Sequence, residues 1–258
     1  MTLRIAFSGK GGTGKTTLSA LAIKYFIEQK ITPLLAVDAD PNSNLNVALG
    51  LEFKETIAEV REEVLEGRVP QGEAKNEFIL RRLNEILVEA DNFDLLVMGR
   101  PESQGCYCAV NHLLRDYLSK LSQQYRVVVM DTEAGMEHLS RRTTDDLDIL
   151  FIVANPDPVS LRAALRIQEI SGKLKLRIKN KYLIINRLNS TLPDPLREMV
   201  EKTMLNLIGT IPEDREVAEA MQQGKSVLDL APSPASQSLH KILEAISTPG
   251  VEEVSIRW

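Results

Sequence analysis

The 258-residue chain is long enough for one large α/β domain or two small ones. Its residues are 43% hydrophobic but only 5% aromatic, so the core must consist mainly of Ile, Leu, Val and Ala, which suits helices packed on a buried parallel sheet. The formal net charge of −5 argues against a general affinity for nucleic acid or for anionic lipid.

Apolar strand-like runs alternate with amphipathic stretches of helix length along most of the chain. The predicted strands are 3–8, 33–37, 93–98, 126–131, 148–154, 181–186 and 207–211. The predicted helices are 15–29, 77–90, 109–123, 159–172, 195–204, 213–223 and 237–246. Several strands are nearly continuous hydrophobic runs, which is typical of central parallel strands buried on both faces. The sequence therefore predicts an α/β fold with a mostly parallel, doubly wound sheet of about seven to eight strands flanked by helices.

The chain is expected to form a single domain over residues 1–246, followed by a short tail over 247–258. Its first residues run directly into a short apolar strand, which does not resemble a secretory leader. No apolar run approaches the ~18 residues that a membrane span requires, and the tail is too short and too acidic for a membrane-targeting helix. We therefore expect a cytoplasmic protein that binds neither membrane nor nucleic acid.

A phosphate-binding motif follows the first predicted strand. Residues 9–17 read GKGGTGKTT, which fits the P-loop pattern G-x-x-x-x-G-K-[ST] between a strand and a helix. Glycines let successive backbone N–H groups turn toward one anion, and the following helix adds its positive end. Lys15 is expected to bind the β- and γ-phosphates of ATP, and the Thr16 hydroxyl is expected to bind Mg²⁺. Further phosphate contacts are expected from Gly11, Gly12, Thr13, Gly14 and Thr17. The alternative, a glycine-rich turn without a ligand, does not explain this context.

A second lysine, Lys10, makes this P-loop unusual. The run KGGTGKTT resembles the deviant Walker A ATPases, a group that includes the septum-site protein MinD, ParA, the nitrogenase iron protein and arsenical pump ATPases. The resemblance implies that Lys10 reaches across a nucleotide-sandwich dimer to the partner's phosphates, as an arginine finger supplied in trans would do. A solvated lysine on a loop is the alternative.

Two acidic segments follow strands that should end at one edge of the sheet. They read DADPN from Asp38 and DTEAG from Asp131. Ligands of open α/β sheets bind outside the carboxyl ends of the strands. By the resemblance, Asp40 would position the hydrolytic water, and Asp38 or Asp131 would touch the Mg²⁺ shell. Gly135 would offer a backbone N–H to the γ-phosphate. The alternative is that the aspartates simply cap turns after strands.

Two later segments resemble the base-binding residues of the same group. Asn186 and Arg187 follow the predicted strand 181–186 at the place of its base-contacting asparagine. Pro212 follows the strand 207–211 and resembles a second wall for the adenine. Neither segment is specific by itself.

The chain has two cysteines, Cys106 and Cys108, just before a predicted helix. Two thiols spaced i, i+2 point the same way if the backbone is extended, and a helix N-terminus favours thiolate. Thiolates select soft or borderline ions such as Zn²⁺, Cu(I), Ni²⁺ or iron–sulfur clusters. A closed tetrahedral site needs four ligands, and a symmetric dimer would supply the missing two. The alternative is a pair of small buried hydrophobic residues.

Four segments together resemble one subfamily. They are GKGGTGKTT, VDADPN, QGCYC and DTEAGMEHLSR. The subfamily is that of the nickel-insertion ATPases, comprising the CooC type, which serves carbon monoxide dehydrogenase, and AcsF, which serves acetyl-CoA synthase. The resemblance is weakest over 53–90 and after 231. It implies that Cys106 and Cys108 of two subunits bind Ni²⁺ or Zn²⁺ at a homodimer interface, with ATP hydrolysis coupled to delivery of the metal to the client enzyme.

Two other functions stay open. An iron–sulfur reductase similar to the nitrogenase iron protein would also use two cysteines from each chain, but its second cysteine follows the switch sequence, and no cysteine follows Asp131 here. A partitioning ATPase of the ParA or MinD kind would leave both cysteines unused. It would also need a surface for DNA or membrane, for which the best candidate is the basic segment 173–181. That segment is more simply interpreted as a solvated turn entering a strand.

Overall fold

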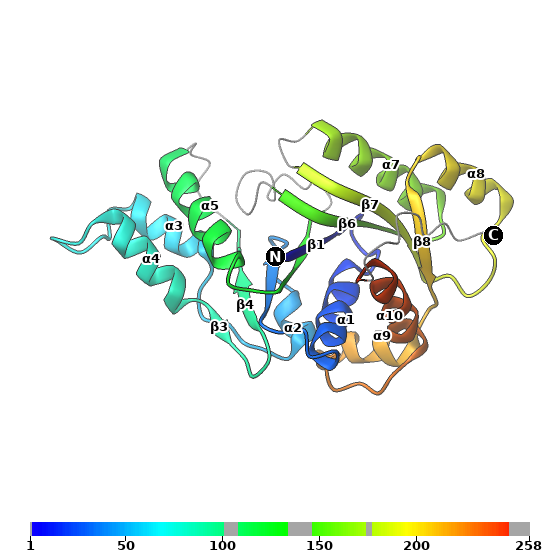
Figure 1. The fold of residues 1–258 in the computed structure, drawn as a ribbon, viewed down its shortest axis with the longest axis horizontal. Helices are drawn as coiled ribbons and strands as arrows, with labels where there is room; N and C mark the ends of the chain where they lie inside the picture. The colour runs from blue at the N-terminus through cyan, green and yellow to red at the C-terminus, as the bar shows by residue number, and fades with distance from the viewer. Residues whose placement is uncertain (1, 101–107, 134–145, 174–176, 248–258) are drawn as a thin grey trace.

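The computed structural model of the protein describes residues 2–100, 108–133, 146–173 and 177–247. They form an eight-stranded sheet with the order β3-β4-β2-β5-β1-β6-β7-β8 (Figure 1). The strands are β1 (Leu3–Gly9), β2 (Leu34–Ala39), β3 (Val88–Glu89), β4 (Asp94–Val97), β5 (Val127–Thr132), β6 (Asp146–Ala154), β7 (Arg177–Asn186) and β8 (Asn206–Ile211). Neighbouring strands are parallel except for β3 and β4 at one edge, which are antiparallel. The predicted mostly parallel α/β fold is confirmed.

Helices cover both faces of this sheet. On one face lie α1 (Lys15–Glu28), α2 (Leu45–Leu49), α9 (Arg215–Gln222) and α10 (Pro234–Ser247). On the other face lie α3 (Ile57–Leu65), α4 (Lys75–Glu85), α5 (Cys108–Ser122), α7 (Pro158–Lys173) and α8 (Asp194–Lys202). Each face of the sheet has its own hydrophobic core. Along β6, Phe151 and Val153 face the core under α1, whereas Leu150 and Ile152 face the core under α7. Burial on both faces is the reason why this strand is a continuous hydrophobic run.

Residues 53–90 differ most from the predicted elements. Helix α4 ends at Glu85, before the end of the predicted helix 77–90, because Val88 pairs with Leu95 in the edge strand β3. Helices α2 and α3 are absent from the sequence-based prediction. The first has five residues, too few to show a helical period, and the second has a glutamate-rich sequence that masks its four buried apolar positions.

The basic segment 173–181 enters a strand, as the simpler interpretation expects. Strand β7 begins at Arg177, four residues earlier than predicted. Arg177 pairs with Asp146 on β6 (Nε–Oδ1 2.7 Å), and Lys179 pairs with Asp148 (Nζ–Oδ1 2.5 Å). These cross-strand pairs neutralise part of the charge that a phosphate-binding surface would need. The boundary between a domain and a tail at 247 stays a prediction, since residues 248–258 lie outside the described part.

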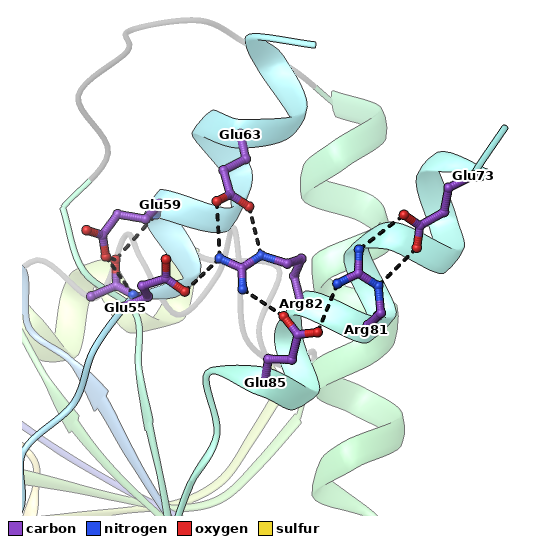
Figure 2. Close-up of polar contacts among 8 residues, drawn as sticks. Glu55, Glu59, Glu63, Glu73, Arg81, Arg82 and Glu85 are labelled. Atoms are coloured by element: carbon purple, nitrogen blue, oxygen red, sulfur yellow. Dashed lines mark hydrogen bonds and ion pairs between the residues drawn. The ribbon is translucent and has the colours of Figure 1, made fainter. Parts of the chain in front are cut away.

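A cluster of ion pairs joins α3 to α4 (Figure 2). The Arg82 guanidinium donates from Nε to Glu63 (2.9 Å), from Nη2 to Glu55 (2.6 Å) and from Nη1 to Glu85 (2.8 Å). Its side chain is only 15% exposed, which shields these pairs from water. The adjacent Arg81 pairs with Glu73 and with Glu85, but its side chain is 46% exposed. Arg82 is therefore the central residue that holds the two helices together.

Helix α3 is in turn fixed to the end of β4. Its N-cap Thr56 forms a capping box with Glu59, in which each residue accepts a hydrogen bond from the backbone N–H of the other. The N–H of Ala58 donates to the carbonyl of Met98 (3.0 Å). Gly99 adopts a left-handed backbone (φ 67°), and a Cβ there would lie 2.4 Å from Thr56 Oγ1. The ion pairs of Arg82 thus support the chain just before the segment 101–107.

Replacing Arg82 with Ala should lower the free energy of unfolding by about 1–2 kcal/mol, because partly buried carboxylates lose their shared partner. Urea denaturation of the purified variant measures this change. The matched control is Arg81→Ala, for which a smaller loss is expected because its ion pairs are exposed. Equal losses for the two variants would contradict a central role for Arg82.

Candidate active site

The predicted nucleotide-site residues that the structure describes gather at one edge of the sheet, where parallel strands present their carboxyl ends. Strand β1 lies between β5 and β6, and β2 lies on the other side of β5 (Figure 1). Asp38 on β2 and Asp131 on β5 are direct register partners, and Asp131 is also the partner of Phe7 on β1. The P-loop leaves β1 just beyond this level. The structure therefore brings the loop, the segment from Asp38 and the described start of the segment from Asp131 together at one edge of the sheet, the usual place for a ligand in such a fold.

Two glycines and one threonine set the shape of the P-loop. Gly12 (φ 82°) and Gly14 (φ 92°) adopt the left-handed backbone that disfavours other residues. The N–H and the Oγ1 hydroxyl of Thr13 both donate to the carbonyl of Lys10 (3.3 and 2.8 Å), which closes the turn. Lys15 is buried at the start of α1, whereas Lys10 is exposed. An exposed Lys10 is available to a second molecule, which its predicted role requires.

Asp38 is held in a setting that disfavours its negative charge. Burial raises the pKa of its carboxyl to about 7, and the nearby charges of Asp131 and Asp40 also raise it. Two backbone hydrogen bonds oppose this effect. The N–H of Leu45 donates to Oδ2 (2.9 Å), and the N–H of Asp40 donates to Oδ1 (3.2 Å). A raised pKa beside a phosphate loop is the expected result when a cation belongs to the site.

Asp131 shows the same effect and fits a magnesium ion. Burial raises its pKa to about 6, although the Thr16 hydroxyl donates to Oδ2 (2.5 Å) and Lys15 lies nearby. Its other oxygen, Oδ1, is buried and accepts no hydrogen bond from the described residues. An unsatisfied carboxylate oxygen next to the Thr16 hydroxyl suits the hydrated Mg²⁺ of a P-loop. The roles of Thr16 as a direct ligand and of Asp38 and Asp131 in the water shell stay predictions.

Asp40 follows directly after β2 and is partly exposed. Its Oδ1 accepts hydrogen bonds from the backbone N–H (2.9 Å) and the side-chain amide (3.0 Å) of Asn42. This turn places its charge close enough to act on Asp38 and Asp131. The position agrees with a carboxylate that orients an attacking water, and that role stays a prediction.

A cavity of about 350 Å³ opens beside Gly14 and Thr17, and the three predicted base contacts line it together. Asn186 donates from Nδ2 to the carbonyl of Thr13 (2.8 Å), and Arg187 donates from Nη1 to the carbonyl of Gly12 (3.2 Å). Both side chains therefore brace the P-loop, a role that the sequence did not indicate. The third predicted contact, Pro212, also lines the cavity and follows β8.

The apolar wall of this cavity was missing from the sequence-based prediction. It includes Leu18 and Leu21 on α1 and Met221 on α9. Their helical spacing was visible, but only the packing of α9 beside α1 shows that they face one cavity. Asp214 fixes this arrangement, because its carboxylate accepts from the N–H of Val217 on α9 (3.3 Å) and from the N–H of Ala235 on α10 (3.0 Å).

The predicted thiolate site cannot be placed from this structure. Cys106 and Gly135 lie outside the described residues, and Cys108 is described only as the first residue of α5, one position before the predicted helix start. Among the described residues, no group of three or more His, Cys, Asp or Glu side chains is arranged to hold a metal ion. In that part of the chain, no helix has the length and apolar character needed to cross a membrane.

The raised pKa of Asp38 predicts that its charge destabilises the nucleotide-free protein. Between the unfolded value of 3.8 and the folded value of about 7, the folded chain binds the Asp38 proton more tightly than the unfolded chain does. Stability contributed by this group therefore falls as the pH rises through that window and levels off above it. Asp38→Asn lacks this titration. From pH 5 to pH 8, wild type should lose about 2 kcal/mol relative to Asp38→Asn.

Urea denaturation of both proteins across this pH range measures the difference in their free energies of unfolding. The asparagine amide has one acceptor oxygen where the carboxylate has two, so the substitution also adds an offset that does not depend on pH, and the slope is the quantity to compare. A difference that stays constant from pH 5 to pH 8 would contradict the prediction.

Comparison with known proteins agrees with this geometry. The family model described as the CobQ/CobB/MinD/ParA nucleotide binding domain matches residues 5–227. The chain is 39% identical over 247 residues to an uncharacterized ATP-binding protein of Methanocaldococcus jannaschii, covering 94% of this chain and 96% of that protein. It is 30% identical over 258 residues to the carbon monoxide dehydrogenase accessory protein CooC of Rhodospirillum rubrum, covering 95% of this chain and 96% of that protein.

Among solved structures, the MinC:MinD cell division protein complex of Aquifex aeolicus shows the same fold. It superposes with a TM-score of 0.69 at 24% identity, covering 100% of this chain and 99% of that one. The family model spans most of the chain and includes both acidic segments and the P-loop. The protein therefore belongs to the CobQ/CobB/MinD/ParA family of nucleotide-binding domains, and it is a P-loop ATPase.

Proposed function

We propose that this ATPase is a metallochaperone for nickel. In this proposal, Cys106 and Cys108 of two subunits bind one Ni²⁺ or Zn²⁺ ion at a homodimer interface. ATP binding and hydrolysis then control transfer of nickel to a client enzyme such as carbon monoxide dehydrogenase or acetyl-CoA synthase. The similarity to the CooC accessory protein, which extends over nearly the whole of both chains, supports this choice of client.

The observation that carries the proposal is a hydrogen bond between the nucleotide site and the end of β4, from which the chain continues toward the cysteines. The N–H of Met98, just after β4, donates to the carbonyl of Asp38 (2.8 Å). Asp38 also binds the N–H of Leu45 at the start of α2 through its side chain. Only nine residues separate Met98 from Cys108, the first residue of α5. A movement of Asp38 on nucleotide binding therefore acts on the chain that leads to both cysteines.

This link supplies the coupling that a metallochaperone needs. Loss of the γ-phosphate changes what holds the segment after β2, and segments of this kind move between two positions in P-loop proteins. If that movement changes the spacing of the thiolates, the ATP state changes metal affinity. By thermodynamic linkage, bound metal then changes ATP affinity by the same factor. The exposed Lys10 would complete the partner's nucleotide site, so that one dimer serves both ligands.

Replacing both cysteines with Ala should abolish binding of Ni²⁺ and Zn²⁺, because the four-thiolate site loses all of its ligands. Equilibrium dialysis with metal analysis should give about one ion per two chains for wild type and none for the double variant. The affinity for Mg-ATP should stay within about twofold, since neither cysteine belongs to the phosphate loop.

Retention of stoichiometric metal by the double variant would contradict the proposal. The same samples distinguish the other two functions. Iron and sulfide in an oxygen-sensitive brown protein would instead favour a reductase. Binding to DNA that weakens steeply between two salt concentrations, in a protein that holds no metal, would favour a partitioning ATPase.

A further inference from the structure

One buried hydroxyl close to the magnesium site has no partner. Ser19 lies on α1, three residues after Thr16, and is 0% exposed. Its Oγ makes no hydrogen bond to any described residue, including the carbonyls of its own helix. A buried hydroxyl without a partner lowers stability, so packing alone would favour Ala at this position. The neighbouring buried residues of α1 are mostly apolar, which makes this serine exceptional in its surroundings.

The nearest unsatisfied acceptor belongs to Asp131. Thr16 and Ser19 are spaced i, i+3 and therefore lie on the same side of α1. Thr16 already contacts Asp131 on β5 through Oδ2, while Oδ1 of the same carboxylate is buried and accepts nothing from the described residues. Burial raises the pKa of Asp131, and the Ser19 hydroxyl lies close enough to oppose this rise as a hydrogen-bond donor. The two groups nevertheless do not meet the geometry of a hydrogen bond in the nucleotide-free protein, so an unpaired donor and an unpaired acceptor lie close to each other.

We propose that Ser19 is a positioning residue for Asp131, whose Oδ1 accepts a hydrogen bond from the Ser19 hydroxyl when Mg²⁺ and nucleotide are bound. The Thr16 hydroxyl continues to donate a hydrogen bond to Oδ2 of Asp131, and the Thr16 oxygen would bind the ion. Two hydroxyls from one helix then fix both oxygens of the carboxylate. Each oxygen has a further lone pair for a water molecule of the Mg²⁺ shell.

The charge of the ion explains why the contact should form on binding. A hydrogen bond to a charged acceptor is roughly twice as strong as one between neutral groups. Helix α1 packs against β5, so the Ser19 side chain is within reach of Asp131. Groups that orient a metal's ligands in this way commonly change metal affinity when they are removed.

Ser19→Ala separates this role from a purely structural one. The dissociation constant for ADP is measured by calorimetry in EDTA and again with excess Mg²⁺. In EDTA the variant should match wild type, whereas its gain in affinity on adding Mg²⁺ should be about three- to tenfold smaller. The thermal midpoint of the nucleotide-free variant should be unchanged or higher, because an unpartnered hydroxyl has been removed.

The matched control is Ser171→Ala on α7. Ser171 is also buried in a helix (3% exposed), but its Oγ donates to the carbonyl of Gln168 (2.7 Å) on the other face of the sheet. This variant should keep the full effect of Mg²⁺. A Ser19→Ala protein with the wild-type gain from Mg²⁺, or with an equal loss of ADP affinity in EDTA, would overturn the proposal. The inference rests on the ATPase site alone and is independent of the nickel role.

Discussion

The pairing of β2 with β5 is the constraint on which the rest of the site depends. It places the buried side chains of Asp38 and Asp131 side by side at one edge of the sheet, next to the loop that leaves β1. Both carboxyl groups have raised pKa values there, so the folded protein holds negative charge where burial opposes it. In the predicted site, a bound Mg²⁺ would offset this cost, because a cation favours the ionised form of both carboxyl groups.

Asp38 also joins the nucleotide site to α2 and to the end of β4. Its side chain holds the start of α2, and its carbonyl holds the chain after β4. Next to that point, Gly99 packs against Thr56 at the start of α3, and the ion pairs of Arg82 join α3 to α4 (Figure 2). The end of β4, α3 and α4 are therefore joined to one another, and the end of β4 is joined to Asp38 by a hydrogen bond. Such an attachment is what coupling between ATP and a bound metal requires.

The sequence predicted the central strands and the P-loop correctly because those signals are local. A strand buried on both faces is a hydrophobic run, and a phosphate loop has a fixed pattern of glycines. It could not predict β3 or α2, which are too short to show a period, or the bracing of the P-loop by Asn186, which depends on how β7 lies in the sheet. The unpaired hydroxyl of Ser19 was also invisible, because a missing partner is a property of the tertiary structure.

The central claim is that nucleotide and thiolate-bound metal share one interface between two copies of the chain. Light scattering with metal analysis tests it most directly, on protein saturated with Mg²⁺, a slowly hydrolysed ATP analogue and Ni²⁺. The account predicts a mass twice the 28.8 kDa of a single chain, with about one nickel ion per pair of chains. A single chain that remains monomeric at saturation with all three ligands would contradict it.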